Sequence, residues 1–136
     1  MVSVLPMNEL NRLATTAEAG GLALSDLVPV CKRYSVAPAG LLNELSIAVA
    51  EGYLGGSLTY EFCDGVMNGI INAVVDLSTN EAMPQPAFSL YQAFDDGERL
   101  RRDDPPGTDT SEKYTKPMVV KIMRALKASS QDGGQI

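Results

Sequence analysis

The chain has 136 residues, of which 45% are hydrophobic and 21% charged, a balance that fits one globular domain and excludes a wholly disordered chain. It has no histidine and only two cysteines, Cys31 and Cys63, which excludes histidine-based catalysis, a disulfide framework and a four-cysteine zinc site. The net charge of −6 is uneven: residues 1–98 hold 12 acidic and 3 basic residues, whereas residues 99–136 hold 5 acidic and 8 basic ones. An acidic body of this kind repels phosphate backbones and favours basic partners.

Apolar residues recur at helical spacing along most of the chain, and no alternating pattern bounded by hairpin signals is present. We therefore expect an all-α fold, a compact bundle of five to six short helices in one domain over residues 1–128. A turn-rich linker at 78–86 would join two halves, 1–77 and 86–128. The polar, glycine-containing end at 129–136 is expected to be a flexible tail.

The first two helices are predicted from their apolar faces and their stop and start signals. The first covers residues 7–19 and ends at a glycine pair that begins with Gly20. The second covers residues 26–34. Taking Asp26 as its cap would place Pro29 at the third helical position, where the missing N–H breaks no hydrogen bond.

The third and fourth helices have the broadest apolar faces. Residues 39–53 form the third, with an inward face of Leu41, Leu42, Leu45, Val49 and Tyr53. The fourth follows a cap at Ser57 or Thr59. Its apolar face consists of Cys63, Val66, Met67, Ile70, Ile71 and Val74. Both cysteines fall on apolar faces, where we expect buried and unreactive thiols, although a single bridge between them stays open.

The fifth helix starts near Pro86 and passes into the charge run 95–104. Its apolar stripe consists of Phe88, Tyr91 and Phe94. Two pairs with the acid four residues before the base are expected to stabilise its end, Asp95 with Arg99 and Glu98 with Arg102. In the alternative, an anion such as phosphate or carboxylate is bound by Arg99, Arg101 and Arg102.

The last helix follows a proline-rich loop at 103–110. A capping box favours a start at Asp109, whereas Pro117 either kinks the helix or resets its start to about Thr115. This helix is basic because it carries Lys113, Lys116, Lys121, Arg124 and Lys127. We expect it to dock on the acidic body of the same chain.

The fourth helix also carries two unusual stripes, since residues four apart share a helix face. The polar stripe consists of Asp64, Asn68, Asn72 and Asp76. The small-residue stripe beside it consists of Gly65, Gly69 and Ala73. Glycine inside a helix costs about 1 kcal/mol relative to alanine, so the glycines need a reason. The sequence leaves open whether their groove receives another helix of the chain or a partner.

The function that this pattern favours is a small acidic helical protein-binding module, for example a regulator, an adaptor or a toxin-immunity protein. We expect it to bind a basic protein or a second copy of itself, with no catalytic activity, no cofactor and no metal. The predicted partner-binding residues are Asp64, Asn68, Asn72, Asp76, Asp95 and Asp96. Tyr60 or Tyr91 would be aromatic anchors if exposed. No signal peptide or bilayer-spanning run is present, so we expect a soluble, cytoplasmic protein.

Two alternatives remain. Residues 26–51 have the proportions of a helix-turn-helix and loosely resemble the DNA-reading unit of bacterial regulators. The predicted outward residues of its second helix are Asn43, Glu44, Ser46 and Glu51, which include no cation for phosphate or guanine and argue against DNA binding. The second alternative is a carboxylate- or arginine-based enzyme, which would need a cleft holding an acid with a strongly shifted pKa.

Overall fold

The computed structural model describes the backbone of residues 4–134 and the side chains of residues 4–129. This part of the chain forms six α-helices and one π-helical turn and contains no strand, so the predicted all-α fold is confirmed. The elements are α1 (Met7–Gly20), α2 (Leu24–Tyr34), α3 (Pro38–Leu54), α4 (Tyr60–Ser78), α5 (Ala87–Asp96), the π turn η1 (Ser111–Thr115) and α6 (Lys116–Gly134).

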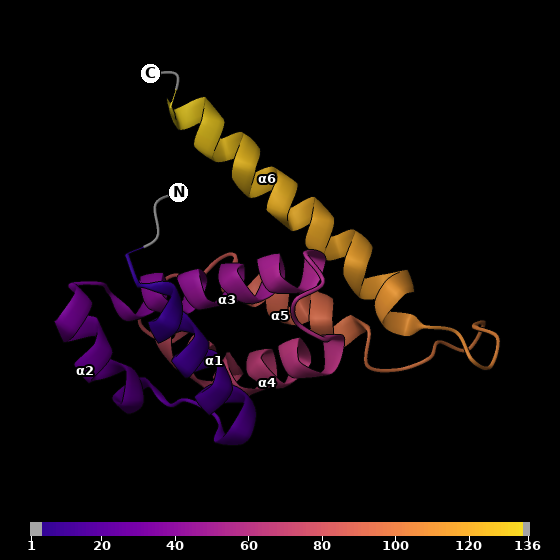
Figure 1. Cartoon of the computed structure of the whole chain (residues 1–136), viewed down its shortest axis with the longest axis horizontal. Helices are drawn as coiled ribbons and strands as arrows, with labels where there is room; N and C mark the ends of the chain where they lie inside the picture. The colour runs from indigo at the N-terminus through magenta and orange to yellow at the C-terminus, as the bar shows by residue number, and fades with distance from the viewer. Residues whose placement is uncertain (1–3, 135–136) are drawn as a thin grey trace.

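Helices α3 and α4 pack against each other at the centre of the molecule, and α1, α2 and α5 each pack against both of them (Figure 1). Leu90 and Phe94 of α5 belong to the same hydrophobic core as the residues of α1 to α4. The segments on both sides of the 78–86 linker therefore pack around one core. Each fully buried leucine or phenylalanine in it contributes about 1.5–3 kcal/mol through the hydrophobic effect.

The close approach of α1 to α4 explains the glycines of α4. A Cβ atom on Gly69 would overlap the backbone carbonyl of Ala17, and one on Gly65 would come within 2.9 Å of the flexible side chain of Glu18. The carbonyl of Gly69 also accepts a hydrogen bond of 2.9 Å from the N–H of Leu22. The small-residue stripe thus receives another helix of the same chain, which resolves the choice that the sequence leaves open.

The predicted start of the fourth helix is confirmed at Thr59, whose hydroxyl accepts a hydrogen bond of 3.1 Å from the N–H of Phe62. The predicted start of the second helix is wrong. The N-cap of α2 is Ala23, and the Asp26 carboxylate reaches back from the first turn to accept the N–H of Ala23 at 2.9 Å. Pro29 therefore lies inside the helix, at an exposed position.

The predicted helical ion pairs of the charge run do not form, because α5 ends at Asp96. Arg99 and Arg102 are exposed in the following loop. Arg101 folds back instead: its guanidinium donates hydrogen bonds to the carbonyls of Asp96 at 2.6 Å and Arg99 at 2.7 Å. The residue after α5, Gly97, is buried, and a Cβ atom there would collide with Thr115, so this position requires glycine.

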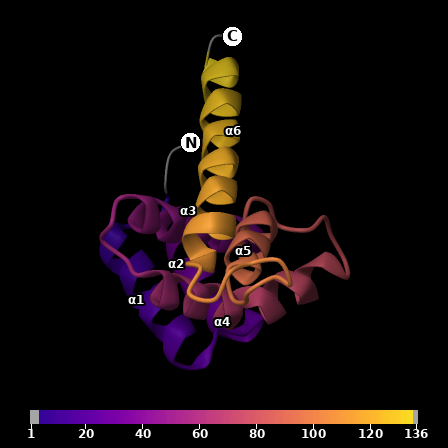
Figure 2. The ribbon, with the colours of Figure 1, turned by 90° about the vertical axis from the view of Figure 1, so that its right-hand side faces the viewer.

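The last helical segment combines both predicted starts. The carboxylate of Asp109 accepts the N–H of Glu112 at 3.2 Å, and the wide π turn then leads into α6, where Pro117 is the second residue. Helix α6 projects away from the body in both views (Figures 1 and 2). It continues to Gly134, through most of the segment predicted as a tail, and residues 135–136 of that segment lie outside the described residues.

The last helix docks on the body through its first turns, where Val119 is buried and Ile122 and Met123 pack against the core, but within residues 4–129 its cations take no part in this docking. Of its cations, Lys116 lies 3.5 Å from Glu112 in the preceding turn. Among the side chains that the structure describes, none forms an ion pair with Lys121, Arg124 or Lys127. These three cations of α6 therefore make no short-range contact with the described acidic residues of the body.

Candidate functional site

The polar stripe of α4 meets the end of α5 at a group of carboxyl side chains. Helix α5 stops at Asp96, and the turn through Gly97 brings Glu98 back over α4. The amide of Asn68 then donates to the carboxyl oxygens of Glu98 at 3.2 Å and Asp64 at 3.5 Å. We call the surface formed by Asp64, Asn68, Asn72, Asp76, Asp95 and Glu98 the acidic face.

Asp64 is the most perturbed group of the acidic face. Burial, a hydrogen bond with Glu98 and the charges of Glu98 and Asp95 together raise the pKa of Asp64 to about 7. Its Oδ1 atom is buried and has no hydrogen-bond partner. The pKa of Asp64 is raised because its ionised form would be buried beside the negative charges of Glu98 and Asp95.

Two tyrosines border the acidic face. Burial, followed by the negative charges of Asp64 and Glu98, raises the pKa of Tyr60, whose hydroxyl donates a hydrogen bond of 2.6 Å to the carbonyl of Phe94. Burial and Asp95 likewise raise the pKa of Tyr91. Both tyrosine hydroxyls therefore stay protonated near neutral pH. Both tyrosines are half-buried, but the hydroxyl of Tyr60 is occupied inside the chain, which makes Tyr91 the better placed of the two to contact a partner.

The structure brings together three of the six predicted partner-binding residues, Asp64, Asn68 and Asp95. Asn72 and Asp76 extend the same helix face and are exposed. Asp96 does not belong to it, since its carboxylate lies 3.7 Å from the guanidinium of Arg101. Sequence reasoning missed the role of Glu98 because it paired this residue with Arg102. The glycine directly before Glu98 was the available signal for a reversal of the chain.

A second polar cluster holds the loop between α5 and η1. The Asp104 carboxylate accepts hydrogen bonds from the Tyr114 hydroxyl at 2.7 Å and the Arg101 N–H at 2.8 Å, and it pairs with the ammonium of Lys113. These contacts, with Lys113 first, lower the pKa of Asp104 to about 2. The Arg101 guanidinium stacks 3.9 Å from the centre of the Tyr114 ring. Because Arg101 is used in this way, the three arginines of the charge run do not converge on an anion.

The position of α3, the second helix of the helix-turn-helix alternative, argues against that alternative. Two of the predicted outward residues of α3, Glu44 and Ser46, are buried. The Glu44 carboxylate accepts the backbone N–H groups of Val4 at 2.9 Å and Leu5 at 3.0 Å. Asn43 likewise accepts the N–H of Ala87 at 3.1 Å. Three of the four predicted outward residues are therefore occupied inside the chain, which argues against DNA reading by α3.

The cysteines are unpaired thiols. Burial raises the pKa of Cys63 to about 12 and also raises that of the half-buried Cys31. Neither is therefore activated as a nucleophile. Within residues 4–129, no group of three or more cysteine, aspartate or glutamate side chains is arranged to hold a metal ion.

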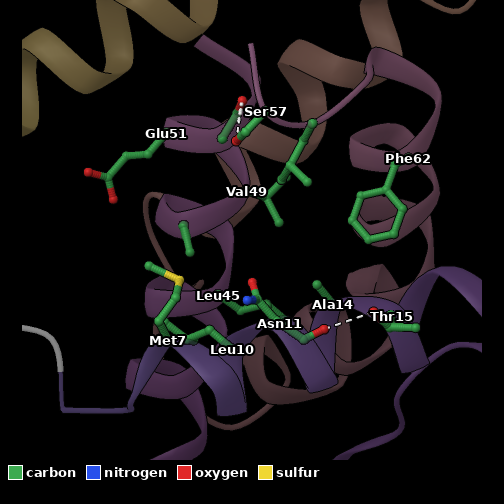
Figure 3. Close-up of a pocket in the computed structure, with 13 residues that line it drawn as sticks. Met7, Leu10, Asn11, Ala14, Thr15, Leu45, Val49, Glu51, Ser57 and Phe62 are labelled. Atoms are coloured by element: carbon green, nitrogen blue, oxygen red, sulfur yellow. Dashed lines mark hydrogen bonds between the residues drawn. The ribbon is translucent and has the colours of Figure 1, made fainter. Parts of the chain in front are cut away.

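A hollow of about 490 Å³ lies on a different side of α3 and α4 from these polar clusters. We call it the α1–α3 groove. Figure 3 shows side chains from α1, α3 and the start of α4 pointing toward one another across it, with Glu51 extending outward at its edge. Its apolar lining includes Met7, Leu10, Leu45, Val49, Leu58 and Phe62. Asp64 does not line this groove.

In the described part of the chain, no helix is long and apolar enough to cross a membrane. Comparisons with protein-family models, with curated proteins and with solved structures find no match to this chain. A functional proposal therefore depends on the geometry of the chain itself.

Proposed function

We propose that this chain is a protein-binding module that recognises a basic partner through its acidic face. The proposal depends on one observation: Asp64, Asp95 and Glu98 lie close together. No lysine or arginine of residues 4–129 forms an ion pair with any of them. Holding these carboxyl groups together is unfavourable for the isolated chain. A cation supplied by a partner would remove part of that repulsion on binding.

The surroundings of this group support recognition of a protein. Asn72 and Asp76 extend the charge and hydrogen-bonding capacity along a rigid helix, and Tyr91 adds an aromatic surface beside it. Interfaces of this kind use peripheral charge to steer the partner and a few aromatic side chains for central contacts. A regulator, an adaptor and an immunity protein would all act in this way, by occupying a surface of the partner.

The enzyme alternative requires an acid with a shifted pKa and a cleft that holds it, and only the first is present in the described part of the chain. Asp64 is an acid with a raised pKa, but it does not line the α1–α3 groove, which is lined mainly by apolar side chains. No reaction is proposed, because Asp64 and a substrate-sized hollow do not coincide.

The test is affinity capture from nuclease-treated lysate of the host, followed by mass spectrometry. The bait variant replaces four carboxyl groups of the acidic face by amides: Asp64→Asn, Asp76→Asn, Asp95→Asn and Glu98→Gln. A matched control removes four exposed charges elsewhere: Glu51→Gln, Glu81→Gln, Asp103→Asn and Glu112→Gln.

We expect a basic protein that is retained by the wild type and the control and lost from the acidic-face variant. Equal capture by both variants would assign binding to another surface. Material that binds only before nuclease treatment would point to nucleic acid and contradict the proposal.

A further inference from the structure

Helix α6 has an apolar stripe that the body covers only in part. Val119 is fully buried, and Ile122 and Met123 pack against the core, but Leu126, one turn further, does not. Beyond this point the helix projects from the body in both views (Figures 1 and 2). The same stretch carries Lys121, Arg124 and Lys127, which form no ion pair with the described part of the chain. An amphipathic basic helix is thus presented outward.

The α1–α3 groove offers the complementary surface. Its lining is mostly apolar, and Met7, which lines it, is 63% exposed, the highest value among the large hydrophobic side chains of the described chain. Methionine adapts readily to partners of different shape. The exposed Glu51 stands at the rim, and residues 1–98, which include the body around it, hold 12 acidic and 3 basic residues in total. The groove therefore combines an apolar floor with an acidic environment.

We infer that the α1–α3 groove binds the projecting α6 helix of a second copy of this chain. An amphipathic helix that lays its apolar stripe in a groove is a common recognition mode, with contacts at spacings of three and four residues. Charge complementarity favours this helix as the occupant, since α6 is basic and the body is acidic. Two α6 helices paired with each other would instead bring Lys121, Arg124 and Lys127 of one copy against the same cations of the other.

Each copy contributes one helix and one groove, so a two-fold arrangement closes with both contacts made. This inference goes beyond the proposed function and uses other residues. Neither Met7 nor Leu126 belongs to the acidic face, so failure of one proposal would leave the other standing.

The experiment is the molar mass of the full chain in solution, measured by light scattering after gel filtration at concentrations up to about 100 μM. The groove variant is Met7→Glu and the helix variant is Leu126→Glu. Both place a charge where an apolar contact is inferred, and neither side chain is buried in the single chain. The matched control is Val75→Glu, which adds the same charge at a 44% exposed position of α4.

We expect a dimer for the wild type and for the Val75→Glu control. Each of the other two variants should weaken the dimer by about tenfold or more, because a buried, unpaired carboxylate is strongly unfavourable. Unchanged helicity by circular dichroism would show that the variants fold.

A mixture of the two variants sharpens the test. One intact contact is possible in the mixed pair, between the α6 of the Met7→Glu chain and the groove of the Leu126→Glu chain. We therefore expect dimer to reappear on mixing. A monomeric wild type, a dimer indifferent to Met7→Glu, or no recovery on mixing would each overturn the inference.

Discussion

Two glycines on one face of α4 meet α1 in different ways. At Gly69 the neighbour is the rigid backbone of Ala17, whereas at Gly65 it is the Cγ atom of the flexible and exposed Glu18 side chain. Backbone cannot move aside without shifting the whole of α1, but a surface side chain can change rotamer at little cost. Only Gly69 is therefore required by the packing of these two helices.

Replacing Gly69 by alanine is expected to lower the free energy of unfolding by about 1–3 kcal/mol, the usual cost of overpacking a core. Gly65→Ala is the matched control. It gains up to about 1 kcal/mol of helix propensity and should be neutral or stabilising. Urea denaturation of both variants measures the difference. Equal effects of the two substitutions would contradict the close approach of α1 to Gly69.

Asp64 is expected to make the chain less stable as the pH rises. Its pKa lies near 3.8 in an unfolded chain and about 7 in the fold, so between these values the folded state holds more protons. The free energy of unfolding therefore falls from about pH 4 to about pH 7, and the loss is complete above pH 7.

The variant Asp64→Asn resembles the protonated carboxyl group and should be more stable than the wild type at about pH 8. Its stability should also vary less between about pH 5 and pH 8. Thermal unfolding at the two pH values measures both effects. An identical loss in wild type and variant would show that Asp64 titrates normally.

The sequence predicted the neighbours of Asp64 only in part. The contact between Asp64 and Asn68 follows from their spacing along one helix. Gly97 signals a reversal of the chain before Glu98, but not that Glu98 reaches α4, because that contact depends on where α5 ends and on the packing of Gly97 against Thr115, a distant segment. Polar residues of the core were also misplaced, since Ser46 is buried and satisfied by the carbonyl of Leu42.

At the scale of elements, the helices were predicted well and the connections poorly. Hydrophobic periodicity and caps are local, so the bounds of α1, α3 and α4 lie within one or two residues of the expected ones. The loop between α5 and η1 is instead organised by Asp104, which reaches Tyr114 ten residues later. Contacts of this kind carry no periodic signal.

Removing the Asp104 carboxylate should loosen this loop without unfolding the body. We expect Asp104→Asn to accelerate amide hydrogen exchange over residues 99–110 while the amides of α3 and α4 keep their protection. The neighbouring exposed Asp103, changed to Asn, is the control and should leave exchange unaltered. Unchanged exchange in the Asp104→Asn loop would rule out an organising role for that carboxylate.

At the scale of the whole molecule, charge is separated in space. The sequence predicted attraction between the acidic body and the basic last helix, but not the direction of that helix. The direction is set where the π turn and Pro117 lead into α6, which then leaves the body after Val119 and Met123. Within residues 4–129, Asp64, Asp95 and Glu98 therefore have no cation paired with them, and Lys121, Arg124 and Lys127 have no anion. We expect both surfaces to bind other chains of opposite charge.

The most direct test of the acidic face is carboxyl footprinting in the presence of the captured basic partner. A carbodiimide labels exposed carboxylates, so a bound partner should slow the labelling of Asp76, Asp95 and Glu98. Glu81 and Asp103 lie outside the face and should be labelled as fast as before. Protection of those two residues, with none at Asp76, Asp95 or Glu98, would contradict the proposed binding surface.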